Sequence, residues 1–285
     1  MRVMVTGASG YVGAAVVAEL VAAGHAVRAV SRSGRAPSGA TGTAADVVRD
    51  DLDETMADID AVIHLVGIIR ENRARGITFE RLHVQATRRV LDAAKRAGVR
   101  RLVHMSALGT GPAGQSRYFS SKWTAEQMVR GAWPSAVIVR PSLLFGGGAP
   151  FFATLVGLAR LPVVPVPGDG TSLFDPVARH DVATALSLMI ADPEAEGRVF
   201  EMGGPQRYSL DALIDHVARA HGRTGPVAKW HMPVGPLRGL ASLLERQPAF
   251  PLTTDQLAML NLPNTTDDHA WHRYVPEPTP LGSNF

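Results

Sequence analysis

The chain contains no cysteine, and this absence removes two kinds of chemistry. Disulfide bonds are excluded, and so are metal sites built on thiolate ligands. The redox compartment of the protein is left open for the same reason. His269 and His272 have a spacing seen among metal ligands, but no further cluster of ligand residues accompanies them. We therefore expect no metal site.

Long uninterrupted apolar runs are also missing. The most apolar stretch, residues 149–168, is broken by Arg160 and by several prolines, which makes it a poor membrane span. At the N-terminus, glycines occur before an apolar segment of the signal-peptide type can develop. The sequence therefore predicts a cytoplasmic location. Its 285 residues, 46% hydrophobic and 19% charged, are enough for one large domain or for a domain with a lobe.

The net charge is only +3, but positive charge is concentrated in residues 70–101, which hold ten Lys or Arg against three Asp or Glu. In a helix, Arg81, Arg88 and Lys95 would lie opposite an apolar stripe. The stripe consists of Phe79, Leu82, Ala86, Val90, Ala93 and Ala97. A solvated outer face is the simpler interpretation, and contact with an acidic partner or an anionic membrane surface is the alternative. Nucleic acid is disfavoured, because the segment lacks interleaved aromatics and any recognisable binding module.

Short β-branched runs alternate with helical patterns in the first half of the chain. Gly24 is placed to end a first helix over residues 11–23. The continuous apolar character of the runs suits a parallel sheet covered on both faces. Alternating β and α units predict an α/β fold, a Rossmann-type doubly wound parallel sheet. The expected strands are residues 2–7, 26–32, 43–50, 61–67, 101–107 and 135–142.

Glycine and proline become frequent after Gly146, which indicates a change in organisation. A helix near Val182–Ala191 and a strand near Val199–Met202 are expected to return to the sheet. Two short helices are expected near Leu237–Leu244 and Thr254–Leu260. We therefore predict a Rossmann domain at 1–146, rejoined by 173–203, and a smaller interleaved C-terminal lobe made of 147–172 and 204–285.

Three glycines, Gly7, Gly10 and Gly13, stand three residues apart between the first strand and the first helix. A phosphate-binding turn needs glycine for its tight bend, for close approach to the pyrophosphate, and for close helix packing. The helix N-terminus adds free N–H groups and a positive dipole end. The turn therefore predicts a dinucleotide site, in which we also expect Ser9, Tyr11 and Val12 to contact the cofactor.

The end of the second strand predicts which dinucleotide is preferred. Sites for NAD usually carry an acidic residue there for the ribose 2′-hydroxyl, whereas this chain has Ser31 and Arg32. A guanidinium attracts a 2′-phosphate, so we expect NADP(H) to bind more tightly than NAD(H). A solvated loop arginine, compatible with NAD(H), is the alternative.

Four further strand ends complete the predicted cofactor contacts. Asp51 is placed to accept a hydrogen bond from the adenine amino group, although loop aspartates are common. Gly67 would allow the backbone after the fourth strand to approach the cofactor closely. The remaining expected contacts are Leu52, Leu65, Val66, Met105 and Pro141.

Several segments resemble the short-chain dehydrogenase/reductase superfamily. They are "TGASGYVG", "DDLDE", "HLVG", "YFSSK", "VRPSLLFG" and Ser106 in "HMSALG". Across nearly its whole length the chain is most similar to an atypical branch, the NAD(P)-binding accessory subunits of respiratory complex I. The segments that carry this likeness are "VIHLVGI", "HVQATRRVLDAAKRAGVRRLVHMSALG", "DPVARHDVATAL", "FEMGGPQRYSL" and "PLTTDQLAML".

The resemblance implies a Rossmann-type domain that holds NADP(H) and a reduced C-terminal lobe. It also implies a structural or assembly role in the respiratory chain, or a link to quinone biosynthesis, with epimerase-like proteins as further relatives. The segment "VRPSLLFGGGAP" lacks the asparagine with which sugar-nucleotide epimerases usually hold the substrate diphosphate. A sugar-nucleotide substrate is therefore the weaker alternative.

Tyr118 and Lys122 are four positions apart in a helical stretch, so their side chains share one face. In active members of the superfamily, the matched tyrosine exchanges a proton with the substrate oxygen. An ammonium beside it and the positive nicotinamide ring favour the phenolate and lower its pKa. The resemblance also implies that Lys122 bonds the nicotinamide ribose and that Ser106 orients the substrate oxygen. Against this, Glu126 lies one turn beyond Lys122 and could draw its ammonium into a surface pair.

Two main hypotheses remain open. In the first, Ser106, Tyr118 and Lys122 make the protein an NADP(H)-dependent reductase of a small apolar carbonyl or quinone-like compound. In the second, it is a non-catalytic NADP(H)-binding subunit or assembly factor that docks on a respiratory complex peripheral to the inner membrane. The basic face of Arg81, Arg88 and Lys95 would then provide the contact. The substrate and the oligomeric state are not indicated by the sequence.

Overall fold

The structure, a computed structural model, describes residues 1–112, 116–244 and 253–282. These residues form two compact units. Unit 1 comprises Met1–Pro141, Arg179–Met202 and Asp268–Glu277, and unit 2 comprises Ser142–Ala178, Gly203–Asp267 and Pro278–Phe285. The division differs from the predicted domains at four places, one of which is Gly203 in unit 2. Residues 142–146 and 173–178 belong to unit 2, and residues 268–277 return to unit 1.

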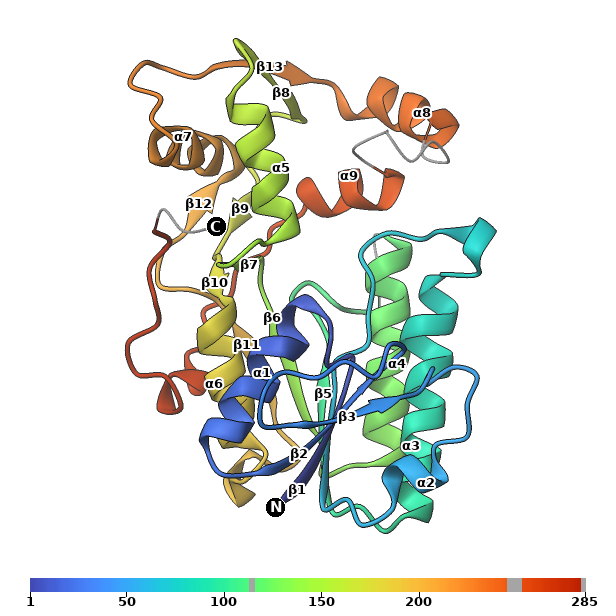
Figure 1. The fold of residues 1–285 in the computed structure, drawn as a ribbon. Coiled ribbons are helices and arrows are strands. Elements are labelled where there is room, and N and C mark those ends of the chain that lie inside the picture. The colour runs from blue at the N-terminus through green and yellow to red at the C-terminus, as the bar shows by residue number, and fades with distance from the viewer. Residues whose placement is uncertain (113–115, 245–252, 283–285) are drawn as a thin grey trace. The chain divides into compact units, whose positions relative to one another are not determined.

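Unit 1 is built on a seven-stranded sheet in the order β11-β6-β5-β4-β1-β2-β3 (Figure 1). Every neighbouring pair is parallel. The order reverses at β1, which has β2 on one side and β4 on the other, so this is the point where a doubly wound sheet binds its ligand. The strands are β1 Arg2–Thr6, β2 Ala26–Ser31, β3 Thr41–Ala44, β4 Ala61–His64, β5 Arg101–Met105, β6 Val137–Pro141 and β11 Val199–Met202. The predicted Rossmann-type fold is confirmed.

Helices cover both faces of this sheet. Figure 1 shows α1 (Tyr11–Ala22) and α6 (Arg179–Met189) on one face, and α3 (Ala86–Arg96) and α4 (Arg117–Ala132) on the other. The second face is sealed by apolar side chains that alternate along the strands and meet α3, as expected for a sheet buried on both sides. These include Met4, Val30, Val62, Leu102, Ile138, Val90 and Leu91. The shorter elements are α2 Asp53–Met56, η1 Arg73–Arg75, η2 Glu80–Gln85, η3 Pro193–Ala195 and η4 Ala270–Arg273.

The predicted strand over residues 43–50 is wrong in its position. The strand β3 ends at Ala44, and Asp46 and Asp50 fold the next residues into a turn. The Asp46 amide donates to the Asp50 carboxylate at 2.7 Å, and the Val48 amide donates to the Asp46 carboxylate at 3.0 Å. Short acidic side chains bond nearby backbone in this way and compete with a sheet ladder.

The predicted basic face is only partly present. Arg88 and Lys95 are exposed on α3, whereas Arg81 is half-buried and donates to the Gly76 carbonyl at 2.7 Å. Residues 80–85 form a π-helical turn, and its wider winding breaks the regular spacing that the sequence analysis assumed. Ala97, placed on the apolar stripe, is exposed at the helix end.

A buried ion pair joins α4 to β6 in unit 1. Glu126 is 0% exposed and accepts two hydrogen bonds from Arg140, at 3.0 and 2.7 Å. Arg130 reaches the same carboxylate at 3.2 Å, and Arg140 also pairs with Glu201 on β11 at 3.1 Å. The idea that Arg140 braces the fold agrees with these contacts, since a buried carboxylate requires such partners.

The described residues of unit 2 form helices and two-stranded sheets. The helices are α5 Pro150–Ala159, α7 Leu210–Ala220, α8 Val234–Leu244 and α9 Thr254–Leu260. The strand pairs are β7 Leu144–Phe145 with β10 Val177–Ala178, β9 Leu173–Phe174 with β12 Tyr208–Ser209, and β8 Val163–Pro167 with β13 Ala228–Met232. A capping box of Thr253 and Gln256 starts α9, which has the predicted bounds.

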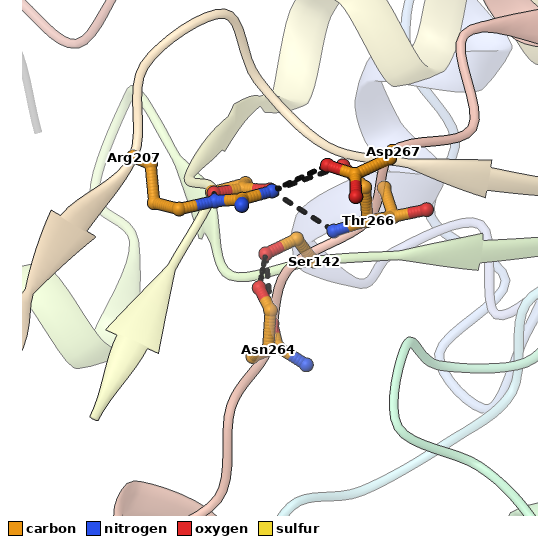
Figure 2. A network of polar contacts seen from close by, with 6 residues as sticks. Ser142, Arg207, Asn264, Thr266 and Asp267 are labelled. Atoms are coloured by element: carbon orange, nitrogen blue, oxygen red, sulfur yellow. Dashed lines mark hydrogen bonds and ion pairs between the residues drawn. The ribbon is translucent and has the colours of Figure 1, made fainter.

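Arg207 ties distant segments of unit 2 together (Figure 2). Its guanidinium makes a two-pronged contact with the buried Asp175, at 2.8 and 2.9 Å, and reaches Asp267 at 3.1 Å. The Thr266 amide donates to the same Asp175 carboxylate at 3.0 Å. These contacts raise the pKa of Arg207, with the Asp175 hydrogen bond as the main cause. The network therefore braces the fold of unit 2.

None of the helices in the part of the chain that the structure describes is long and apolar enough to cross a membrane.

Arg140→Met should lower the free energy of unfolding by about 3 kcal/mol, because it leaves the buried Glu126 carboxylate short of its main partner. The double variant Glu126→Leu/Arg140→Met should recover most of that loss, because it removes both charges. Urea unfolding of the two variants measures this. Arg100→Met is the control, since its pair with Asp60 is exposed and should contribute less than about 1 kcal/mol. Equal stability of the single and double variants would contradict the buried-pair account.

Candidate cofactor and active site

The turn between β1 and α1 requires glycine at two positions for different reasons. Gly7 has a φ of 73°, a left-handed conformation that favours glycine. At Gly13, an added Cβ would overlap the Gly7 carbonyl oxygen and the Ala8 Cα, so only glycine lets α1 pack this close to the loop. Gly10 is the N-cap of α1 and carries no side-chain cap, which leaves the amides of the first turn available to an anion.

This turn lies at the strand-order reversal, between the ends of β2 and β4. The Ala8 amide donates to the Val30 carbonyl at 3.2 Å, and the Leu65 amide donates to the Thr6 carbonyl at 3.2 Å. A Cβ on Gly7 would stand 3.1 Å from the backbone of Leu65 and Val66. The structure thus brings the predicted glycine turn and the predicted contacts after β4 together.

The other predicted contacts of the turn differ in exposure. Ser9 is exposed, whereas Val12 is buried and packs in the core, so Val12 can reach a ligand only through its backbone. Tyr11 is half-buried, with the Arg179 guanidinium over its ring at 4.7 Å.

At the end of β2, Ser31 and Arg32 differ in their surroundings. The buried Ser31 hydroxyl donates to the Arg35 carbonyl at 3.3 Å, which fixes the loop that follows. Arg32 is exposed and makes no ion pair with any described residue. Its guanidinium is therefore available to an anionic group at this strand end.

Asp51 and Leu52 directly precede the short helix α2. The Asp51 carboxylate accepts from the Asp53 amide at 3.0 Å, and the Leu52 side chain is buried in the core. A loop-capping role therefore already explains Asp51, and Leu52 can contact a cofactor only through its backbone.

Lys122 is held at the end of β5. Its Nζ donates to the Met105 carbonyl at 2.6 Å, and a Cβ on Gly67 would lie 3.9 Å from Nζ. Burial lowers the pKa of Lys122 to about 8, against an opposing influence of Glu126. Glu126 does not draw the ammonium into a surface pair, because Glu126 is buried and bonded to Arg140. The structure thus places Lys122 beside Met105 and Gly67.

Tyr118 stands one turn before Lys122 on α4, whose N-cap is the Ser116 hydroxyl. Its ring is enclosed by Phe79, His83 and Phe119, with ring centroids 5.8, 5.6 and 5.4 Å away. Burial raises the pKa of Tyr118 to about 12. In the chain without its cofactor, desolvation of the phenolate sets this pKa, and the lowering expected from the ammonium and the nicotinamide ring together stays a prediction.

Ser106 directly follows β5 and is 1% exposed. Its amide donates to the Val139 carbonyl at 2.7 Å, while its hydroxyl has no hydrogen-bond partner among the residues described. A buried hydroxyl without a partner costs about 1–3 kcal/mol, so a ligand oxygen would relieve a real deficit there. Pro141, at the end of β6, accepts from the Leu108 amide at 3.0 Å.

The sequence analysis did not predict a set of hydrogen-bonded side chains that joins the ends of β1 and β4 to α3. Thr6 at the end of β1 bonds His64 at 2.7 Å, and His64 bonds Thr87 on α3 at 3.1 Å. The Thr87 hydroxyl donates its one proton to the His83 carbonyl. Its oxygen therefore accepts from His64 Nε2–H, and His64 Nδ1 accepts from the Thr6 hydroxyl. Burial, followed by the charge of Lys122, lowers the pKa of His64 to about 3.

The sequence analysis also missed His83. It was not placed on the predicted apolar stripe, but it follows Phe79 by four residues and precedes Ala86 by three, and it is buried. This helical spacing could have identified His83 from the sequence, because a titratable ring on the core-facing side of a helix needs polar partners.

The rings of His269 and His272 are tilted by 36° to one another, with centroids 4.9 Å apart. In the described ranges, no group of three or more His, Asp or Glu side chains is arranged to hold a metal ion.

A parallel sheet with a glycine turn at its strand-order reversal, followed by a tyrosine and lysine on one helix, defines a Rossmann-type dinucleotide-binding protein. A sequence profile of the NAD dependent epimerase/dehydratase family matches residues 3–203. The chain therefore belongs to the NAD-dependent epimerase/dehydratase family, and the predicted resemblance is confirmed.

Curated relatives fall into two groups. The chain is 29% identical over 237 residues to the mitochondrial NADH dehydrogenase [ubiquinone] 1 alpha subcomplex subunit 9 of Mus musculus, covering 82% of this chain and 62% of that protein. It is 33% identical over 196 residues to a ceramide reductase of Caulobacter vibrioides, covering 66% and 60%. A ketoreductase of a farnesylated quinoline oxide from Stigmatella aurantiaca is 32% identical over 171 residues, covering 51% of each chain. The matched part thus spans less than two thirds of each relative.

Solved structures share the fold at lower identity. A nucleoside-diphosphate-sugar epimerase from Staphylococcus aureus superposes with a TM-score of 0.80 at 18% identity, over 99% of both chains. The UDP-glucuronic acid 4-epimerase of Bacillus cereus, solved with UDP-glucuronic acid and NAD, gives 0.75 at 17% identity, over 99% of this chain and 95% of the other.

The free energy of unfolding should rise with pH between about 8 and 10, and part of this rise should come from Lys122. The unfolded lysine keeps its ordinary pKa of 10.5, whereas the folded one has a pKa of about 8, so the unfolded chain binds more protons in this window. The increment amounts to at most about 1.4 kcal/mol per pH unit. Urea unfolding at pH 7.0 to 9.5 should show a steeper rise for the wild type than for Lys122→Met. Parallel curves for the two proteins would contradict a buried ammonium.

Proposed function

We propose that the chain is an NADP(H)-dependent reductase or dehydrogenase of a small, apolar carbonyl or quinone-like compound. The observation that supports this most is the buried Lys122 ammonium, which bonds the carbonyl of Met105 at the end of β5. The next residue is Ser106, whose buried hydroxyl has no hydrogen-bond partner among the described residues. Buried titratable groups with shifted pKa values gather at functional sites, and here they stand at the edge of the sheet where such folds bind ligands. The glycine turn, which a Cβ at Gly13 would fill, fits a dinucleotide pyrophosphate.

The cofactor, when bound, supplies or accepts a hydride at its nicotinamide ring. In the direction of reduction, the Tyr118 hydroxyl would donate its proton to the substrate carbonyl oxygen while the Ser106 hydroxyl hydrogen-bonds that oxygen. Lys122 would stabilise the resulting phenolate and bond the nicotinamide ribose. A pKa of about 12 keeps Tyr118 protonated at neutral pH, so the hydroxyl carries the proton that reduction requires.

Two relatives support a reductase with an apolar substrate. One is named ceramide reductase and the other a ketoreductase of a farnesyl-bearing quinoline oxide, so each name combines reduction with a lipophilic compound.

A non-catalytic role in a respiratory complex is the second candidate. The match to the subunit from Mus musculus, which covers 82% of this chain, favours it. The exposed Arg88 and Lys95 of α3 would then contact an acidic partner peripheral to the inner membrane. A sugar-nucleotide epimerase or dehydratase is the weaker alternative, since the likeness to solved epimerases extends to the fold alone.

NADP(H) should bind more tightly than NAD(H), because the exposed Arg32 guanidinium is available to a 2′-phosphate. Replacing Arg32 with Asp should weaken NADP(H) binding at least tenfold, or about 1.4 kcal/mol, and leave NAD(H) equal or tighter. Calorimetric titration of both cofactors against both proteins measures this. Arg49→Asp, at an exposed site with its own partner Asp46, is the matched control. Tighter NAD(H) binding by the wild type would overturn the NADP(H) preference.

Tyr118→Phe should reduce NADPH-dependent turnover of apolar ketones or quinones by at least about a hundredfold, with NADPH affinity kept within twofold. The phenyl ring preserves the contacts with Phe79 and His83 and removes only the hydroxyl. Absorbance at the NADPH band follows turnover, and a fluorescence titration follows binding. Cofactor binding without turnover in the wild type, together with an unchanged cellular phenotype of the variant, would favour the non-catalytic role.

A further inference from the structure

His83 joins three segments of unit 1 through its two ring nitrogens. Nδ1 lies 2.8 Å from the Ser121 hydroxyl on α4, and Nε2 lies 3.1 Å from both the amide and the carbonyl of Ile68, after β4. The residue itself sits in the π-helical turn Glu80–Gln85 that precedes α3. Such turns often occur at functional sites, because they displace one side chain from the regular helix positions.

The proton positions on His83 follow from its neighbours. Ser121 has one hydroxyl proton and donates it to the Tyr118 carbonyl at 2.7 Å, so its oxygen accepts from His83 Nδ1–H. With the proton on Nδ1, the neutral ring accepts at Nε2 from the Ile68 amide. Burial and the nearby Lys122 charge lower the pKa of His83 well below its usual value, which keeps the ring neutral.

Packing fixes the plane of the ring as well. Phe79 stacks on His83 with centroids 5.3 Å apart, and Tyr118 meets it edge-on at 5.6 Å. A Cβ on Gly67 would lie 3.5 Å from His83 Nε2 and 3.9 Å from Lys122 Nζ. The Gly67 backbone, the His83 ring and the Lys122 ammonium therefore converge on one place.

We propose that His83 is a positioning residue for the nicotinamide half of the dinucleotide. By bonding Ile68 on one side and Ser121 on the other, it sets the separation between the Gly67 backbone and the Tyr118–Lys122 face of α4. The inference rests on the proposed function only in requiring that NADP(H) binds with its nicotinamide ribose at Lys122. His83 itself transfers no proton in this scheme.

Three substitutions separate the hydrogen bonds from the packing. His83→Phe keeps an aromatic ring for Phe79 and Tyr118 and removes both hydrogen bonds. His83→Gln places an amide oxygen near the position of Nε2, where it can accept from Ile68. His83→Asn is the matched control, since its shorter side chain reaches only the Ser121 side.

The ligands for the test are NADP⁺ and 2′,5′-ADP, which carries the adenine and 2′-phosphate half alone. For His83→Phe, NADP⁺ should bind about tenfold more weakly while 2′,5′-ADP binds within twofold of the wild type. His83→Gln should restore NADP⁺ affinity to within about threefold, and His83→Asn should not. A purely structural role would weaken both ligands together in His83→Phe and would overturn the proposal, as would unchanged NADP⁺ affinity.

Nitrogen-15 NMR of histidine-labelled protein gives a readout that needs no ligand. His83 should show a protonated Nδ1 and an unprotonated Nε2 at pH 7, assigned by loss of the signals in His83→Phe. The opposite tautomer would overturn the proposal. If the wild type binds neither NADP⁺ nor 2′,5′-ADP, the proposed function is wrong, and so is the positioning role of His83. Observation of the predicted tautomer would then support only the hydrogen-bonded link from Ile68 through His83 to Ser121.

Discussion

A single buried ammonium group organises the electrostatics of this site. The Lys122 Nζ gives one hydrogen bond to the Met105 carbonyl, and burial lowers its pKa to about 8. Burial first, and after it the charge of Lys122, lower the pKa of His64, His83 and His104, which lie under the same edge of the sheet. Neutral rings have defined tautomers when their partners are fixed, so the ammonium helps to order the hydrogen bonds around it.

The counter-charge is kept at a distance from that ammonium. Glu126 lies one turn away on α4 but is bound by Arg140 and Arg130. If Glu126 paired directly with Lys122, the lysine would lose its contact with Met105 and its pKa would rise toward the ordinary value. The ion pair between α4 and β6 therefore serves the site as well as the fold, because it leaves Lys122 facing the strand ends.

Local signals in the sequence predicted the parts of the site that depend on spacing. The glycine trio and the four-residue interval from Tyr118 to Lys122 have a direct geometric meaning, and the doubly wound parallel sheet follows from the alternating units. The π-helical turn at Glu80–Gln85 could not be predicted, since it depends on what packs against the helix. The same holds for the turn of Asp46 and Asp50, where side chains compete with the ladder.

Long-range pairing escaped prediction for a different reason. Residues 268–277 return to unit 1 through contacts such as Glu201 with Asp268 at 3.3 Å, which no local pattern indicates. The buried role of Glu126 likewise depends on Arg140, fourteen residues away on another element. Charged residues at helical spacing look alike in sequence whether their partner is water or a buried guanidinium.

The unpartnered hydroxyl of Ser106 bears on whether the site only holds a cofactor or also performs chemistry. A protein that merely binds the dinucleotide gains nothing from a buried hydroxyl without a partner, because alanine would fit the same space and remove a cost of about 1–3 kcal/mol. The ribose and pyrophosphate contacts need Lys122 and the glycine turn, but they do not need Ser106 or the Tyr118 hydroxyl. The Ser106 hydroxyl after β5 and the Tyr118 hydroxyl on α4 are the groups that proton transfer to a carbonyl oxygen requires, and this favours the reductase over the scaffold.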